Sequence, residues 1–313
     1  MSTQPSTTAT PLSHVLQGGY AHPLTRSLQV SRTYLNKEML MFPIFISDDP
    51  NAQQPIDSFP NQFRQDSMYS KVSFDHSSKR VAIGHVIWGT HELSKRCRGT
   101  PADDENGPTI SAIRLLKEKF PSLFVAADVC LCDGTNSCGG FKLRSSGCRL
   151  CGSERHDGRE DRAIKQALID ARLANRCCLM SYSAKFASAL YGPFRAAACS
   201  APSLGDRKGY QLPPNARGLA KRAIIRDISE GADIIMVKPA QTYLDVVSEA
   251  RSLAPSHPLA CYQVSGEYAA LLAGADAGVY ELKSMVLETL DCMLRAGATL
   301  ILTYFTPMLL DWL

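Results

Sequence analysis

The strongest constraint on the fold is a helix-then-strand rhythm in which the strands are apolar on both faces. From residue 108 onward, each helical stripe is followed by a short, largely apolar run. These runs stand at 123–129, 178–183, 232–237, 259–264 and 299–303. Such strands need helices on both sides, as in a parallel sheet. The rhythm predicts an α/β fold, and for 313 residues the (β/α)8 TIM barrel is the natural closed form.

The N-terminal part differs from this rhythm. Residues 1–13 are rich in Ser, Thr and Pro, which is typical of a terminal tip without a packed core. We assign residues 1–35 to an N-terminal arm and 36–313 to the barrel domain. The apolar run Met39-Leu-Met-Phe-Pro-Ile-Phe-Ile46 predicts the first strand of that domain.

Composition excludes several classes of protein. The 34 basic and 30 acidic residues nearly balance, which does not favour a nucleic-acid partner. No apolar run approaches the ~20 residues that cross a bilayer, and the start lacks a signal peptide. We expect a soluble cytoplasmic protein with no membrane or nucleic-acid partner. Its eleven cysteines are then reduced thiols or metal ligands.

Two lysines stand at the ends of apolar strands. Lys185 follows Met180-Ser-Tyr-Ser-Ala184, and Lys238 follows Ile234-Ile-Met-Val237. At the mouth of a barrel, apolar surroundings disfavour the ammonium form. A neutral lysine can attack a carbonyl to form a Schiff base. The alternative is that each side chain extends its ammonium to solvent.

Long motifs around both lysines resemble the δ-aminolevulinic acid dehydratase (porphobilinogen synthase) family. The motifs include Ser183-Ala-Lys185-Phe-Ala-Ser-Ala-Leu-Tyr-Gly-Pro-Phe-Arg195, Gly205-Asp-Arg207-Lys-Gly-Tyr-Gln211, Met236-Val-Lys238-Pro, Tyr262-Gln-Val-Ser265-Gly-Glu and Thr303-Tyr304-Phe-Thr-Pro307. The resemblance covers residues 14–64, 99–132 and 162–313. It implies a TIM barrel, a homo-octamer built with N-terminal arms, and condensation of two 5-aminolevulinate molecules to porphobilinogen with loss of water, a step of tetrapyrrole (heme) biosynthesis.

The resemblance also implies roles for single residues. Lys238 forms a Schiff base with one substrate molecule and Lys185 with the other, while Asp128 is a polar partner near them. One substrate carboxylate is held by Arg195, Arg207 and Gln211, and the other by Ser265 and Tyr304. An arginine fork suits a planar carboxylate. Each of these residues also has a purely structural interpretation. The arginines would be a surface pair, Ser265 a turn residue, Tyr304 a core residue and Asp128 a cap at the end of its strand.

A zinc site is implied less directly. Zinc-dependent family members hold the ion through three cysteines, and here Cys130 and Cys132 match that pattern. Cys138 comes earlier than the third ligand of the family, and the flanking histidine is absent. Cys138 is either a substitute ligand or a coincidence. Zinc is therefore the predicted cofactor, with magnesium as the alternative.

Two stretches, 65–98 and 133–161, break the rhythm, because they are polar and lack either periodicity. Back-translation of 80–92 and 146–161 with a one-nucleotide advance allows the family motifs Phe-Gly-Val-Pro and Ala-Pro-Ser-Asp-Met. We infer frameshifted stretches, with true divergence as the alternative. The chain as given should then lack two barrel strands, a loss far larger than the ~5 to 15 kcal/mol by which domains are stable.

Three other functions compete with the dehydratase. A different class I Schiff-base enzyme of the aldolase type would need only one lysine, so the pair Lys185 and Lys238 argues against it. A zinc-binding module could use Cys130, Cys132, Cys138, Cys148 and Cys151, but the last two lie in an aberrant stretch. A catalytically dead family member that only assembles is the remaining alternative.

Overall fold

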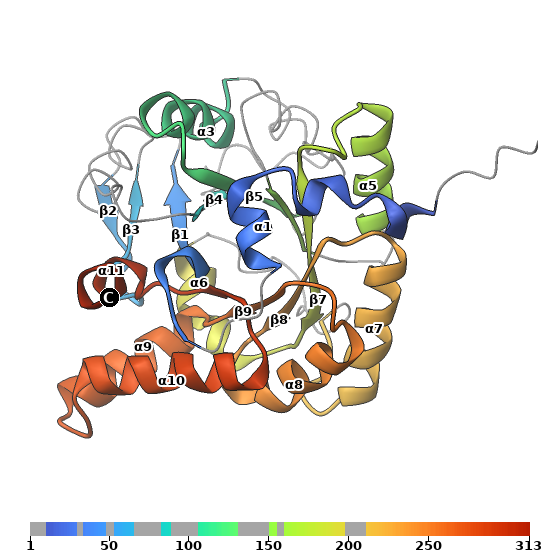
Figure 1. Cartoon of the computed structure of the whole chain (residues 1–313). Coiled ribbons are helices and arrows are strands. Elements are labelled where there is room, and N and C mark those ends of the chain that lie inside the picture. Colours follow the sequence, from blue (N-terminus) through green and yellow to red (C-terminus); the bar gives the residue numbers. More distant parts are fainter. Residues whose placement is uncertain are drawn as a thin grey trace, which may run out of the picture.

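Eight parallel strands close into a ring that helices surround (Figure 1). In this computed structural model the described residues are 11–29, 34–47, 53–65, 83–88, 106–130, 150–154, 160–197 and 211–313. The ring strands are β1 (Leu40–Ile46), β4 (Ile83–Trp88), β5 (Phe124–Cys130), β6 (Leu150–Glu154), β7 (Cys178–Lys185), β8 (Ile234–Lys238), β9 (Leu259–Tyr262) and β10 (Leu300–Leu302). Each pairs with the next in chain order, and β10 pairs with β1. This is the closed parallel architecture that the rhythm predicts.

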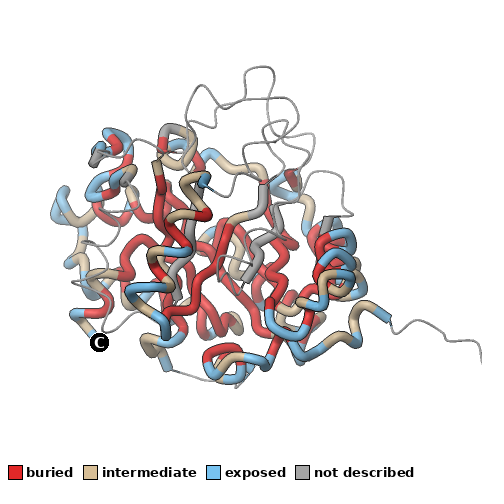
Figure 2. Tube along the Cα trace, turned by 90° about the horizontal axis from the view of Figure 1, so that it is seen from above, coloured by how far each residue is buried: buried red, intermediate tan, exposed pale blue. Residues whose placement is uncertain are grey.

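The apolar strands form the core of the ring. Every residue of β7, β8, β9 and β10 is buried, and Figure 2 shows that buried residues concentrate in the strands. The strands in this half and β1 lie where the apolar runs predict them, with ends displaced by one or a few residues. Burial on both faces explains why these runs do not alternate with polar residues.

The helices cover the outside of the ring and connect its strands. They are α3 (Pro108–Lys119), α5 (Glu160–Asp170), α6 (Gly192–Ala197), α7 (Arg217–Ser229), α8 (Leu244–Leu253), α9 (Ser265–Asp276), α10 (Leu282–Ala296) and α11 (Thr306–Trp312). In α10, Val286, Leu290 and Met293 form the buried stripe. Among the helices described, none has the length and apolar character to cross a membrane.

The described N-terminal segment packs against the amino-terminal ends of the strands. It contains η1 (Leu12–His14), η2 (Gln17–Gly19) and α1 (Pro23–Leu28). The carbonyl of Gly18 accepts a hydrogen bond from the Cys178 thiol, which begins β7, at 2.6 Å. A Cβ at position 18 would lie 2.6 Å from the carbonyl oxygen of Cys177, so this close approach requires glycine.

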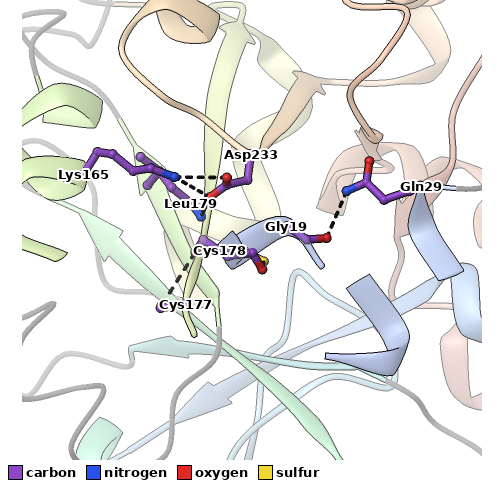
Figure 3. Close-up of polar contacts among 8 residues, drawn as sticks. Gly19, Gln29, Lys165, Cys177, Cys178, Leu179 and Asp233 are labelled. Atoms are coloured by element: carbon purple, nitrogen blue, oxygen red, sulfur yellow. Dashed lines mark hydrogen bonds and ion pairs between the residues drawn. The ribbon is translucent and has the colours of Figure 1, made fainter. Parts of the chain in front are cut away.

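A buried ion pair lies at the same end of the barrel (Figure 3). Lys165 of α5 is fully buried, and its Nζ lies 3.0 Å from both carboxylate oxygens of Asp233, which immediately precedes β8. The same carboxylate accepts the backbone N–H of Leu179 at 2.8 Å. Burial raises the pKa of Asp233, and Lys165 opposes that rise. These contacts fasten α5 and β7 to the start of β8.

The prediction that the chain as given lacks two barrel strands is wrong. Strand β4 falls inside stretch 65–98 and pairs with β1 and β5, while β6 falls inside stretch 133–161 and pairs with β5 and β7. Backbone groups make these ladders, and Ile83-Gly-His-Val-Ile-Trp88 is rich in residues with high β-propensity. A change of reading frame is not needed to close the ring. Apart from residue 65 in β3 and residues 160 and 161 in α5, the other residues of both stretches lie outside the described ranges.

A short hairpin extends the sheet beyond β1. Strands β2 (Gln53–Pro55) and β3 (Phe63–Gln65) pair with each other in antiparallel fashion, and β3 pairs with the carboxyl end of β1. The turn between them buries Phe59, whose ring lies 4.5 Å from the ring of Tyr304. The hairpin thus packs over the carboxyl ends of the strands, the end at which TIM barrels place their active sites.

Candidate active site at the carboxyl ends of the strands

The two predicted lysines are neighbours. Lys185 is the last residue of β7 and Lys238 the last residue of β8, and they are directly opposite each other in the parallel register. Their exposed fractions are 9% and 4%. The Phe186 N–H donates to the carbonyl of Lys238 at 2.9 Å, which fixes the two strand ends together. Two buried amines therefore share one side of the mouth.

Aromatic rings surround the ammonium group of Lys238. Its Nζ lies within 6 Å of four ring centroids: Tyr262 at 4.3 Å, Tyr182 at 5.0 Å, Phe194 at 5.4 Å and Tyr191 at 5.7 Å. The Nζ of Lys185 lies 5.8 Å from the Tyr191 centroid, so the two lysines share that ring. Ring faces attract a cation, while their apolar bulk excludes the water that would solvate it.

Tyrosine hydroxyls connect this cage to two other predicted site residues. The Tyr182 hydroxyl donates to the carboxylate of Asp128, on β5, at 3.1 Å. The Tyr262 hydroxyl lies 2.8 Å from the Tyr304 hydroxyl. Burial is the main cause that raises the pKa of Tyr182, Tyr262 and Tyr304, so all three hydroxyls remain protonated donors at neutral pH.

The predicted carboxylate-binding residues Ser265 and Arg195 lie on elements that touch. The Ser265 hydroxyl, in the first turn of α9, accepts the N–H of Phe194 at 3.0 Å and donates to the carbonyl of Leu190 at 3.2 Å. Arg195 follows Phe194 in α6. A Cβ at Gly266 would lie 2.6 Å from the Leu190 carbonyl oxygen. Glycine therefore allows α9 to approach η6 (Ala189–Tyr191) closely.

Gln211 lies beside the end of β7. The next residue, Leu212, donates its N–H to the carbonyl of Lys185 at 3.0 Å, and its own carbonyl accepts the N–H of Ala187 at 2.8 Å. Gln211 is buried. Of the remaining predicted residues, Cys130 ends β5 opposite Glu154 of β6. Arg207, Cys132 and Cys138 lie outside the described residues.

A group of carboxylates in the described residues differs from the predicted thiolate site in chemistry and place. Asp161 of α5, Asp227 of α7 and Glu230 after α7 bring ligand atoms within 4.8 Å of one another. Protein donors already contact two of them: Asp227 accepts from Ser181 at 2.8 Å and from Arg226 at 3.1 Å, and Glu230 accepts the N–H of Arg162 at 3.4 Å. These bonds connect the group to β7, α5 and α7.

The aromatic cage was not predicted as part of the site. Tyr182 and Tyr191 flank Lys185 in the sequence, whereas Tyr262 is 80 positions from Tyr182 and ends a different strand. The available signal was that aromatic residues stand at several of the strand ends that a barrel would bring to one mouth. Only the closed ring shows that they meet at Lys238.

Comparison with known proteins agrees with this geometry. A family model described as Delta-aminolevulinic acid dehydratase matches residues 14–146 and 141–312. Proteins of that name from Schizosaccharomyces pombe and Bos taurus are each 46% identical, over 325 and 323 residues, covering 96% of this chain and 98% of each relative. The Toxoplasma gondii ME49 enzyme, solved with its reaction product porphobilinogen, has a TM-score of 0.84 and 29% identity, with 100% of this chain and 92% of that chain covered. The chain belongs to the δ-aminolevulinic acid dehydratase family.

Proposed function

We propose that this protein is a porphobilinogen synthase, a hydro-lyase that condenses two 5-aminolevulinate molecules in tetrapyrrole biosynthesis. The observation that carries the proposal is the pair of buried lysines in register at the barrel mouth. Relatives that align along nearly the whole chain bear the dehydratase name. An aldolase-type enzyme would not need the second buried lysine.

The lysines supply the covalent chemistry. The neutral amine of Lys238 attacks the ketone carbon of one substrate, and the ketone oxygen leaves as water when the imine forms. Lys185 reacts in the same way with the second substrate. Each lysine is released when the substrates bond to each other, so two water molecules leave for each porphobilinogen. Both amines are buried side by side at the strand ends, where each can reach a substrate bound at the mouth.

The polar residues around the lysines orient the substrates. Arg195, Arg207 and Gln211 hold one carboxylate, and Ser265 and Tyr304 hold the other by hydroxyl donation. The Ser265 hydroxyl now donates to the Leu190 carbonyl at 3.2 Å and would exchange that acceptor for the substrate carboxylate, while the Tyr304 hydroxyl lies 2.8 Å from that of Tyr262. Asp128 orients the Tyr182 hydroxyl beneath Lys238.

The metal and the assembly are proposed from the family resemblance. Members of this family use zinc or magnesium. Three thiolates suit zinc, so Cys130, Cys132 and Cys138 would hold it; when bound, zinc polarises oxygen as a Lewis acid. Because Cys138 is displaced from the family position, we expect weak zinc binding, and stoichiometric, chelator-resistant zinc in the purified protein would contradict that expectation.

The proposed assembly is a cytoplasmic homo-octamer in which the arm, residues 1–35, connects barrels formed by residues 36–313. The described arm residues 11–29 lie against the barrel of their own chain. The molar mass in solution, measured by light scattering, should equal eight chains. A monomeric mass would contradict the assembly without bearing on the lysine chemistry.

The function is tested by product formation. The purified full chain is incubated with 5-aminolevulinate, before and after chelation and after return of zinc or magnesium, and porphobilinogen is quantified. We expect one porphobilinogen for two substrate molecules consumed. A folded chain that forms no porphobilinogen under any of these conditions would support the alternative of a family member that only assembles.

A further inference from the structure

One buried carboxylate joins the turn after Lys238 to the turn that carries Ser265. Glu267 lies in the first turn of α9, and its exposed fraction is 3%. Its carboxylate accepts the backbone N–H groups of Gln241 at 2.7 Å, Val264 at 2.7 Å and Ala240 at 3.4 Å, and it also has a backbone hydrogen bond with Thr242. The donor Val264 belongs to the turn after β9, and the others belong to the turn after β8.

Helix capping explains only part of this arrangement. The bond from Val264 is local, because a glutamate at the third helical position commonly accepts the N–H at the start of its helix. The bonds from Ala240 and Gln241 instead connect two different strand ends. Pro239 has no N–H, so Ala240 carries the first backbone donor after Lys238. Glu267 therefore holds the chain through the first backbone N–H that follows Lys238.

The charge state of Glu267 controls the strength of these bonds. Burial raises its pKa to about 7, against the opposing effect of the backbone donors. The groups that face it are Tyr191 of η6, Tyr243 of η8 (Gln241–Tyr243) and Cys261 of β9; burial raises their pKa values, so they remain neutral in this range. Protonation replaces an acceptor lone pair with a donor. The bonds should weaken as the pH falls through about 7.

We infer that Glu267 is a positioning residue for the lysine chemistry. It sets the separation between Lys238, where the imine forms, and Ser265, which binds a substrate carboxylate. It acts through the backbone of the two turns and does not touch the substrate. This inference rests on the proposed function of Lys238 and Ser265.

Two variants and one matched control test the inference. Glu267→Gln keeps the length but replaces one acceptor with a donor, and Glu267→Asp keeps the charge but shortens the reach by one methylene. Glu281→Gln is the control, because Glu281 also accepts backbone N–H groups, those of Lys283 and Ser284, but at the exposed start of α10. The readout is the amount of 5-aminolevulinate trapped by borohydride at Lys238 relative to Lys185.

We expect this ratio to fall about 10- to 100-fold in both Glu267 variants, the effect of misplacing a reactive group by about 1 Å. The ratio should not change in Glu281→Gln. A purely structural role would lower labelling of Lys185 and Lys238 together. An unchanged ratio in folded Glu267 variants would overturn the inference.

A second measurement needs neither variants nor substrate. Amide hydrogen exchange of the unaltered protein is followed at Gln241 from pH 8 to pH 6 and corrected for the intrinsic exchange rate. Its protection should fall about 10-fold as Glu267 protonates, which matches the loss of a hydrogen bond to a charged acceptor. An unprotected Gln241 amide at pH 8 would overturn the inference, because Glu267 would then not hold this turn. Absence of any lysine label in the unaltered protein would instead contradict the proposed function, and the exchange result would still decide whether Glu267 holds the turn.

Discussion

Lysines are buried at both ends of this barrel, but their neighbours differ. At the amino-terminal end, Lys165 lies 3.0 Å from both oxygens of the Asp233 carboxylate (Figure 3). At the carboxyl end, Lys238 lies among aromatic rings and directly opposite Lys185 in the neighbouring strand. The first lysine contacts a carboxylate, whereas the second contacts ring faces and is paired in register with another lysine.

The comparison shows that burial alone does not make a lysine reactive. A carboxylate partner keeps an ammonium charged and fixed, because the pair compensates for the water that both groups lose. Lys238 instead has ring faces as neighbours and a second lysine opposite it, the arrangement that the proposed imine chemistry uses. We therefore assign a structural role to Lys165 and a chemical role to Lys238.

Substitution of Lys238 should have the largest effect on activity. Lys238→Ala removes the amine to which the proposal assigns the imine, so porphobilinogen formation should fall by about 10⁴-fold or more. Lys221→Ala, at a half-exposed position of α7, is the matched control and should retain activity. Turnover and thermal unfolding are measured for both proteins. Substantial turnover by Lys238→Ala would remove the distinction between the two ends of the barrel.

Substitution of Lys165 should affect stability rather than chemistry. Lys165→Met leaves the Asp233 carboxylate buried without its cation, which should lower the free energy of unfolding by about 3 to 5 kcal/mol. The loss should grow as pH rises above about 4, because burial raises the folded-state pKa of Asp233 and the folded state then favours the proton. Denaturant unfolding of both proteins at several pH values measures this difference in the free energy of unfolding.

The double variant Lys165→Met with Asp233→Asn tests whether the unpaired Asp233 carboxylate causes the loss of stability. It removes the buried negative charge together with the cation, so its stability should be less dependent on pH than that of Lys165→Met. The kcat of the folded Lys165→Met protein should stay near that of the unaltered protein. A large fall in kcat with unchanged stability would place Lys165 in the chemistry and reverse the comparison.

A smaller effect is expected for Tyr304, which belongs to the mouth but forms no covalent bond. Tyr304→Phe removes a hydroxyl that the proposal places on a substrate carboxylate, so KM should rise about 10-fold while kcat changes less. Tyr280→Phe removes a hydroxyl that contacts only backbone carbonyls of α9 among the described bonds. It should leave KM unchanged. Equal kcat losses in both variants would argue against the carboxylate role.

The sequence predicts the fold best where burial is uniform. Strands β7 to β10 and β1 are apolar on both faces, so each is visible from its own residues. Strands β4 and β6 were missed because each is a short run inside a polar stretch without either periodicity, and their places are set by ladders to neighbouring strands. Such pairing is not encoded in the periodicity of the strand itself.

The residues of the candidate site also fall into two groups, those that the sequence indicates and those that only the fold brings together. Lys185 and Lys238 were identified because each ends a strand, and strand ends of one barrel meet at one mouth. The contacts of Glu267 and the rings around Lys238 depend on residues from several strands, so their roles follow only from the closed ring. The number of residues between two positions does not give the distance between the strands that carry them.

The most direct test of the account is to trap the imine. The unaltered protein is treated with borohydride in the presence of labelled 5-aminolevulinate, and the labelled lysines are identified by peptide mapping. The account predicts label at Lys238 and none at the ion-paired Lys165. Borohydride reduces an imine to a stable secondary amine, and the account places the imine at the mouth of the barrel. Label confined to Lys165 or to exposed lysines such as Lys221 would contradict it.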